Sequence, residues 1–288
     1  METFVQSLVS GLLMGSLYAM IGIGLTVIFG VMRIINLAHG EMVMLGMFAA
    51  FFSQKLFGID PFLSVLALAP AMFAVGVLIY RFLLRKVIPG GELNTLLYTA
   101  GMSLLVANLA LFAWSGDYRT ITLSYGLAPL RPLGIAVPVA LAIGFGMAAA
   151  VTTALWLFLG ATDTGRAIRA TSQNREAAIL MGIDVEKVAV LTFGLGTALA
   201  GTAGVLLAPS LYLYPTVGEL LIVKSFVIVV LGGLGSVPGA IAGGLLLGLV
   251  ESLGAVYVSA TYKDGLGYVL FLLVLLYRPA GLFGVGKS

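Results

Sequence analysis

Five ionisable side chains lie inside or beside long apolar runs of the sequence: His39, Glu41, Glu219, Lys224 and Glu251. Because burying a charge away from water is costly, such groups usually pair, face a polar interior or take part in function. Glu41 and Glu251 are flanked by apolar residues on both sides. The pattern allows three interpretations of these two carboxylates: a proton relay, a contact to a transported solute, or a structural position in an ion pair or at a helix end.

His39 is the only histidine, and the chain contains no cysteine. A multi-histidine or thiolate metal site and a thiol nucleophile are therefore excluded. Because Gly40 follows it, we expect His39 first as a turn residue. We find no nucleophile paired with a base, which argues against an enzyme. No G-x-x-x-x-G-K-[ST] phosphate loop is present, so ATP is not bound here in the usual way.

Two glycine-rich or polar clusters interrupt apolar runs, Asn36–Gly40 and Gly232–Gly239. Helices broken at membrane depth line binding sites and pathways in transporters, whereas glycine, serine and proline also form plain turns between two helices. Both interpretations stay open. The candidate pathway residues are Asn36, His39, Gly40, Glu41, Gly232, Gly233, Gly235, Ser236, Gly239 and Glu251.

A polar stretch between two apolar runs, residues 160–187, has the signals of a short capped helix. Thr162 and Asp163 are helix-capping side chains, and Ser172 or Asn174 can cap the segment that follows. Arg175 to Met181 are good helix formers, and Gly182 suits the position after a helix end. Asp184 then caps the next run. We expect a stiff knuckle with Ala178, Leu180 and Met181 on one face and Arg175 and Glu176 on the other, a docking element for a cytoplasmic partner.

The composition identifies the chain as an integral membrane protein. Hydrophobic residues make up 60% of its 288 residues and charged residues only 9%, far from the quarter or so that is usual in soluble proteins. Apolar runs cover roughly residues 4–30, 37–52, 62–84, 93–113, 136–159, 187–211, 220–235, 238–256 and 265–277. These runs predict an all-α polytopic bundle of about eight or nine spans with broken or re-entrant helices, in a single transmembrane domain, 1–288.

The positive charges predict an orientation in the membrane. If residues 160–187 face the cytoplasm, ten of the fifteen Lys and Arg residues lie on the inner side. Five lie on the outer side: Lys55, Arg119, Arg131, Lys224 and Lys263. Since inner loops carry the excess of positive charge, we expect the N-terminus outside and the C-terminus in the cytoplasm.

Small residues recur at every fourth position in three of the runs, beginning at Gly11, Gly196 and Ala240. Such stripes let helix backbones approach closely in lipid. They are interpreted either as packing within one bundle or as a contact with a second subunit.

Four motifs together carry a resemblance to a known family. "EAAILMG" (Glu176–Gly182) resembles the coupling motif of ATP-binding-cassette importer permeases. "NLAHGEMVMLG" (Asn36–Gly46), "GRAIRATSQNREAAILMGI" (Gly165–Ile183), which contains that motif, "GGLGSVPGAIAGGLLLG" (Gly232–Gly248) and "YRPAGLFG" (Tyr277–Gly284) are together similar, in the same order, to the branched-chain amino acid permease family. Within that family the chain is most similar to the smaller of two homologous permease subunits.

The resemblance implies an importer of two such permeases, two cytoplasmic ATP-binding subunits and an extracytoplasmic solute-binding protein, in a bacterial or archaeal inner membrane. It implies that ATP and Mg are bound by the partner ATPase, with no cofactor and no nucleic acid in this chain. Arg175, Glu176, Ala177, Ala178 and Gly182 would form the ATPase-coupling site. Relatives handle branched-chain amino acids, urea, short amides or aromatic acids, and the low charge of the pathway favours a neutral or zwitterionic solute. The alternative is a stand-alone secondary transporter or channel, which leaves the knuckle without a role.

Overall fold

The computed structural model describes residues 2–125, 129–130 and 135–283. Arg131 and Lys287, which entered the charge count, and Gly284 of the last motif lie outside the described residues. The helices and strands are α1 (Glu2–Met32), α2 (His39–Phe57), α3 (Pro61–Ile79), the π-helical turn η1 (Tyr80–Leu84), α4 (Arg85–Val87), η2 (Ile88–Gly90), α5 (Glu92–Trp114), β1 (Pro129–Leu130), β2 (Val137–Pro138), α6 (Val139–Ala161), α7 (Asp163–Gln173), α8 (Arg175–Leu180), α9 (Val185–Leu207), α10 (Val217–Gly232), α11 (Val237–Tyr257) and α12 (Lys263–Tyr277).

Each of the nine predicted apolar runs corresponds to a helix, so the prediction of an all-α membrane bundle is confirmed. Helices prevail because lipid offers no partner for backbone N–H and C=O groups, which must bond within the segment. Among the described residues, six helices are long and apolar enough to cross a membrane: α1, α3 with its continuation to Gly90, α5, α6, α9 and α11. Helices α2, α10 and α12, of 19, 16 and 15 residues, are not among these six.

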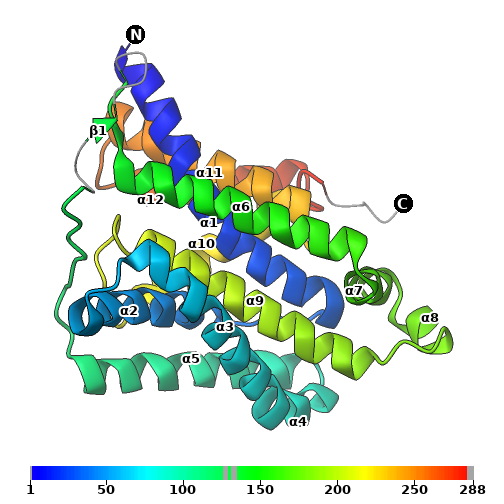
Figure 1. Ribbon diagram of the computed structural model, residues 1–288. Helices are drawn as coiled ribbons and strands as arrows, with labels where there is room; N and C mark the ends of the chain where they lie inside the picture. The colour runs from blue at the N-terminus through cyan, green and yellow to red at the C-terminus, as the bar shows by residue number, and fades with distance from the viewer. Residues whose placement is uncertain (1, 126–128, 131–134, 284–288) are drawn as a thin grey trace.

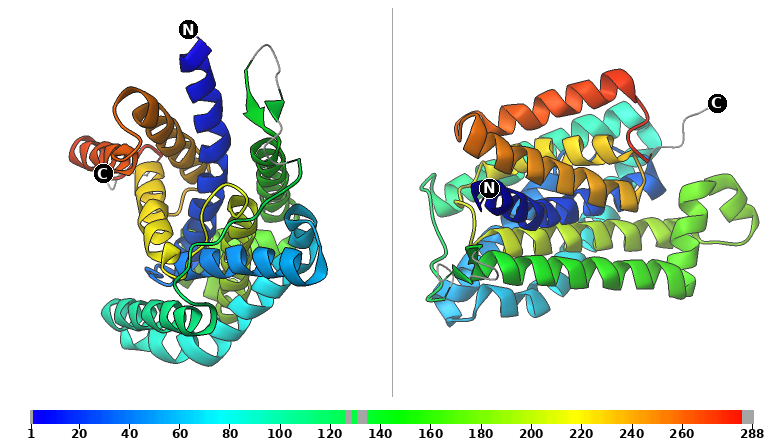
Figure 2. Two further views of the ribbon diagram at one scale, coloured as in Figure 1. Left: turned by 90° about the vertical axis from the view of Figure 1, so that its left-hand side faces the viewer. Right: turned by 90° about the horizontal axis from the view of Figure 1, so that it is seen from above.

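The bundle has a buried centre and an apolar outer surface. Helices α1 and α9 are largely buried, whereas α3, α5 and α6 expose most of their length. Large apolar side chains such as Leu66, Leu104 and Phe112 are exposed on the outer surface. Figure 2 shows this arrangement, with α1 among the other helices and α5 at the margin. An exposed apolar surface of this kind is what a lipid environment requires.

Helices α1 and α11 pack backbone against backbone along their small-residue stripes. A Cβ added at Gly15 would lie 2.8 Å from the carbonyl oxygen of Gly244, and one at Gly11 would lie 2.9 Å from that of Gly248. Gly196 of α9 approaches α1 in the same way, because a Cβ there would lie 2.8 Å from the carbonyl oxygen of Gly24. These stripes therefore serve packing within this chain, the first of the two interpretations.

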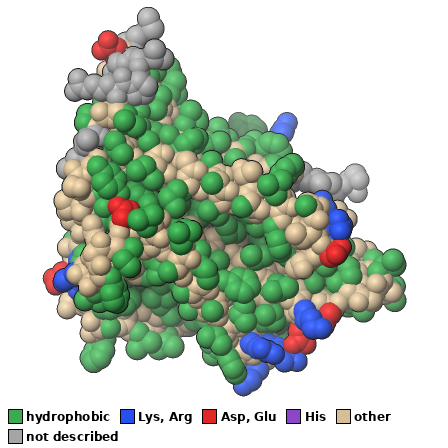
Figure 3. Space-filling view, in the orientation of Figure 1, with side chains coloured by type: hydrophobic (Ala, Val, Ile, Leu, Met, Phe, Trp, Pro, Cys, Tyr) green, Lys and Arg blue, Asp and Glu red, His purple; other side chains and the backbone are tan. Residues whose placement is uncertain are grey.

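Charged side chains gather at one end of the bundle, around α4, α7 and α8 (Figure 3). Three ion pairs lie there: Arg85 with Glu186 at 2.8 Å, Arg166 with Asp163 at 2.5 Å and Lys187 with Asp184 at 2.9 Å. Lys224, which the sequence analysis counted on the outer side, lies inside α10 with its side chain 3% exposed, and it pairs with the carboxylates of Glu251 and Asp264.

Candidate functional site

The knuckle predicted between the fifth and sixth apolar runs is the pair of helices α7 and α8. Thr162 caps α7 by accepting a hydrogen bond from the amide of Gly165 at 2.9 Å. Asn174, rather than Ser172, caps α8, and its side-chain oxygen accepts from the amide of Ala177 at 3.0 Å. Asp184 caps α9 through the amide of Lys187 at 3.1 Å. The backbone groups at three consecutive helix starts are thus satisfied by side chains within the segment.

Gly182 ends α8 in the left-handed region, at φ +80°. Its amide donates to Ile179 at 3.0 Å, and the amide of Ile183 donates to the carbonyl of Ala178 at 3.0 Å. A positive φ is easy only for glycine, so this residue permits the sharp return into α9. Figures 1 and 2 show α8 projecting beyond the other helices at this end of the bundle.

The two faces of α8 are divided differently from the prediction. Ala178 is only 3% exposed and packs inside this chain, whereas Leu180 is 87% and Met181 82% exposed. Grouping Ala178 with Leu180 and Met181 on one face was therefore wrong, because α8 lies against its own chain on the Ala178 side. Arg175 and Glu176 are exposed. The surface available to a partner is charged at the start of α8 and apolar at its end.

The first interruption, Asn36–Gly40, is a short turn at Leu37 and Ala38 followed by the start of α2 at His39. The Nε2 atom of His39 lies 3.0 Å from the carbonyl oxygen of Ile21, so α2 begins beside the middle of α1 and not at its end. Thr99 of α5 accepts a hydrogen bond from the amide of Leu37 and donates one to the carbonyl of Ile35, both at 3.2 Å. These contacts supply partners for backbone that no helix satisfies. His39 is accordingly a buried first residue of α2 and not an exposed turn residue.

Glu41 is fully buried where the starts of α2 and α10 meet. Its Oε1 atom accepts a hydrogen bond from Ser103 at 3.1 Å. Its other oxygen, Nδ2 of Asn36 and Nδ1 of His39 have no protein partner among the described residues. Gly40 is needed for this junction, since a Cβ there would overlap the carbonyl oxygen of Gly218. The result is a compact polar cluster between helices.

The second interruption, Gly232–Gly239, is a turn between α10 and α11. Gly233 and Gly235 have positive φ values of 101° and 84°. Ser236 caps α11 by accepting from the amide of Gly239 at 3.1 Å. Residues Gly232 and Gly239 are in backbone contact, which leaves no room for a Cβ on either. In geometry this segment is the plain turn of the two interpretations.

Glu251 belongs to a buried ion network. Its side chain, 7% exposed, pairs with Lys224, and the same ammonium lies 2.7 Å from an oxygen of Asp264. The Lys224 nitrogen also lies 4.8 Å from the centre of the Tyr18 ring. Glu251 thus has the structural partner that one interpretation of its sequence pattern required, and it joins α10, α11 and α12.

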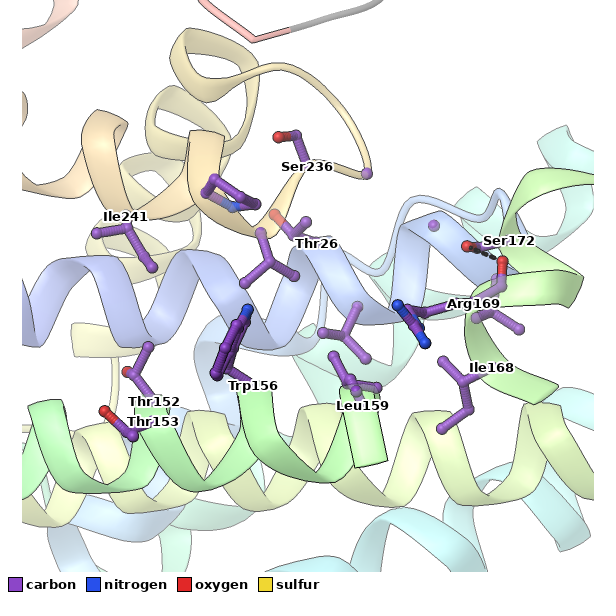
Figure 4. Close-up of a pocket in the computed structure, with 17 residues that line it drawn as sticks. Thr26, Thr152, Thr153, Trp156, Leu159, Ile168, Arg169, Ser172, Ser236 and Ile241 are labelled. Atoms are coloured by element: carbon purple, nitrogen blue, oxygen red, sulfur yellow. Dashed lines mark hydrogen bonds between the residues drawn. The ribbon is translucent and has the colours of Figure 1, made fainter. Parts of the chain in front are cut away.

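A cavity of about 550 Å³, called here the α6 cavity, lies between α1, α6, α7 and the start of α11. Gly235 and Ser236 of the second interruption line it, together with Thr26, whose buried hydroxyl has no described partner. Figure 4 shows Trp156 on α6 and Arg169 on α7 directed into this space toward α1. The α6 cavity therefore combines hydroxyls and one cation with apolar walls.

A second cavity of about 640 Å³, called here the α5 cavity, lies between α1, α5 and α10. Arg33 and Glu92 line it, and most of the remaining wall is apolar. Neither Arg33 nor Glu92 was among the candidate pathway residues. The sequence contained one indication for Arg33: it directly follows a long apolar run, and a charged residue at such a helix end is expected to have a specific partner or role.

No cluster of three or more metal-ligating side chains occurs in the described ranges. The arrangement offers a projecting helix, α8, and two cavities between helices.

The chain was also compared with known proteins. Residues 7–275 match the family model described as branched-chain amino acid transport system, permease component. The chain is 35% identical to the high-affinity branched-chain amino acid transport system permease protein BraD of Pseudomonas aeruginosa, over 98% of this chain and 96% of the relative. It is 34% identical to LivH, the protein of the same description from Escherichia coli strain K12, over the same shares.

A more distant similarity extends to another solute. The ribose import permease protein RbsC of Escherichia coli strain K12 is 30% identical, over 70% of this chain and 59% of the relative. No solved structure matches the chain.

Proposed function

The chain belongs to the family of permease components of branched-chain amino acid transport systems, and we infer that it is the membrane-spanning permease subunit of an ATP-driven importer for branched-chain amino acids or similar small zwitterionic solutes. As a transport permease it is not itself an enzyme. The 1–288 chain would act as one transmembrane domain in the cell membrane. ATP and Mg would be bound by separate partner subunits.

The observation that carries the proposal is the exposed end of α8. Leu180 and Met181 are almost fully exposed on a helix that side-chain caps and a glycine turn hold in place. Fully burying one such side chain is worth about 1.5–3 kcal/mol. Two would contribute about 3–6 kcal/mol to docking, which corresponds to roughly 10²–10⁴ in affinity. Arg175 and Glu176 would add charge-assisted contacts at the rim.

We place this end of the bundle in the cytoplasm. Arg81, Arg85, Lys86, Arg166 and Arg169 lie on the same side as α8 by sequence order and contact, in keeping with the positive-inside rule. The N-terminus would then be outside and the C-terminus inside. A solute-binding protein would dock on the opposite end, and a homologous second permease would complete the membrane part.

Docking is tested by changing the exposed residues of α8. The chain is co-expressed with the ATP-binding subunits of its transport system and purified from membranes. Leu180→Glu and Met181→Glu should each reduce the amount of co-purified ATP-binding subunit at least tenfold, because a charge would enter a buried apolar contact. Glu176→Lys should also reduce it, because it reverses the charge that makes the contact at the rim. Phe57→Glu, an exposed apolar residue on α2, is the matched control and should leave co-purification unchanged. Normal co-purification of all three α8 variants would contradict the proposal.

The orientation has its own test, which the absence of cysteine makes simple. A cysteine introduced at exposed Gln173 should resist an impermeant thiol reagent added to intact cells and react after the membrane is opened. Ready labelling from outside would reverse the proposed topology.

A further inference from the structure

The α5 cavity has one cation and one anion in otherwise apolar walls. Arg33 follows α1 directly, and Glu92 is the first residue of α5. Leu25 and Phe29 of α1 and Phe226 and Val229 of α10 contribute to the apolar wall. Neither charged side chain forms an ion pair within the described part of the chain, although both are exposed to the same space. The cavity volume of about 640 Å³ is in the range of small-molecule sites.

Arg33 also has an unfavourable backbone conformation. Its φ is +52°, and its amide donates to the carbonyl of Phe29 at 2.8 Å, which closes the end of α1. This left-handed position after a helix is normally taken by glycine, because a side chain is strained there. A glycine would close the helix end equally well, so the helix end does not explain why this residue is an arginine. The strained position does place a guanidinium at the edge of the cavity.

The cavity lies at the end of the bundle that carries α7 and α8. Gly30, shortly before Arg33, approaches both Ser172 of α7 and Gly235 of the α10–α11 turn. A solute that crosses the bundle toward the ATPase side would leave the protein at this end. This placement depends on the orientation given under the proposed function.

We propose that the α5 cavity is a release subsite that holds the transported amino acid as a zwitterion. Arg33 binds the α-carboxylate, Glu92 binds the α-ammonium, and the apolar walls of α1 and α10 contact the branched side chain. A guanidinium suits a carboxylate because its planar fork matches two oxygens. This inference rests on the proposed function, and it names the side chains that would bind the two charged groups of the transported amino acid.

The α6 cavity fits a zwitterion less well. Arg169 is its only charged lining residue, so an ammonium group would find hydroxyls but no carboxylate there. The α5 cavity offers a partner of each sign. A solute that lacks either charge should therefore bind the α5 cavity more weakly than an amino acid does.

Binding is measured by cysteine protection in the complete transporter. Val230 lines the α5 cavity, and Val230→Cys would be the only cysteine of this chain. The transporter in lipid nanodiscs, without ATP, is labelled with N-ethylmaleimide in the presence of L-leucine, 4-methylpentanoate or 3-methylbutylamine. L-leucine should slow labelling. The two analogues, which lack the ammonium or the carboxylate, should need about tenfold higher concentrations for the same protection.

Variants assign the two contacts. Arg33→Gly should abolish the preference for L-leucine over 3-methylbutylamine, and Glu92→Gln the preference over 4-methylpentanoate. Because glycine suits the left-handed position, Arg33→Gly should not lower the melting temperature, so loss of binding cannot be attributed to misfolding. Lys86→Gln removes an exposed cation outside the cavity and should change no preference.

The outcomes separate the inference from the proposed function. If the unaltered transporter takes up leucine but L-leucine gives no protection, or the preferences survive both variants, the release subsite is refuted and the permease function stands. If the unaltered transporter, reconstituted with its ATPase and binding protein, takes up no branched-chain amino acid, the proposed substrate fails and the inference fails with it.

Discussion

The ion network around Lys224 provides the sharpest stability prediction. Lys224→Met keeps the length of the side chain but removes the cation that pairs with Glu251 and Asp264. Breaking a buried pair by removing one partner costs about 3–5 kcal/mol, because the remaining charge loses its compensation. Asp264 is 33% exposed and can regain water, so most of the cost comes from Glu251, which is 7% exposed.

The double variant Lys224→Met with Glu251→Met should recover most of this lost stability. Lys224→Met with Glu251→Met removes both deeply buried charges and fills a similar volume with apolar atoms. Replacing a buried pair in this way is often neutral or stabilising. We therefore expect the double variant to lie within about 1 kcal/mol of the unaltered chain, and so to be about 2–4 kcal/mol more stable than the single variant Lys224→Met.

Thermal unfolding in detergent micelles, followed by fluorescence, measures both effects. With about 2–4 °C of melting temperature per kcal/mol for a chain of this order of size, the single variant should melt at least about 6 °C lower. Lys86→Met, the same change at an exposed position, should melt within about 1 °C of the unaltered chain. If Lys224→Met and the double variant melt at the same temperature, the cation does not compensate Glu251 and the reasoning is refuted.

Three further predictions follow from single contacts. Gly15→Leu should destabilise the chain by about 1–3 kcal/mol or more, because its Cβ would meet backbone atoms of α11 at 2.8–2.9 Å. The control is Gly101→Ala, whose added Cβ would have no atom within 4 Å. It should be neutral or stabilise the chain by up to about 1 kcal/mol in the same assay. Gly182→Val should disfavour the φ of +80° after α8 and reduce co-purification of the ATP-binding subunits while the amount of permease in the membrane stays constant. Burial raises the pKa of Tyr125 to about 12, and its hydrogen bond to Asp60 adds to the shift. Since this pKa lies above the ordinary value of about 10, the stabilisation is complete below pH 10 and is lost as the pH rises through 12; melting temperatures of the Tyr125→Phe variant should lack this loss.

Much of the local structure followed from the sequence alone. The nine apolar runs became helices because a lipid-facing segment has to satisfy its own backbone. The helix starts at Thr162 and Asp184 could be predicted from the sequence, because a capping side chain accepts a hydrogen bond from an amide only two or three residues away. The positive φ of Gly182 could also be predicted, since it depends only on the absence of a Cβ in that residue.

Contacts between helices depended on the tertiary structure. The sequence marked Glu251 as a buried carboxylate, but its partners lie on α10 and α12, and only the rotation and depth of three helices bring them together. In the same way, the contact of α8 with its own chain decided that Ala178 faces inward while Leu180 faces outward. Neither result has a signal within one helical turn of the residue concerned.

The residues of the candidate site were likewise found partly from the sequence and partly only from the tertiary structure. The sequence identified the interruptions around Gly40 and Gly235 from residue type, yet it did not decide whether they line a pathway or form plain turns. The position of the start of α2 beside the middle of α1 is a tertiary feature, seen in the contact of His39 with Ile21. Arg33 and Glu92 are far apart in the chain and line one cavity only because α1 and α5 end and begin at the same depth of the bundle. Residue types and short spacings fix helices, caps and turns, whereas the packing of whole helices decides which charges share a space.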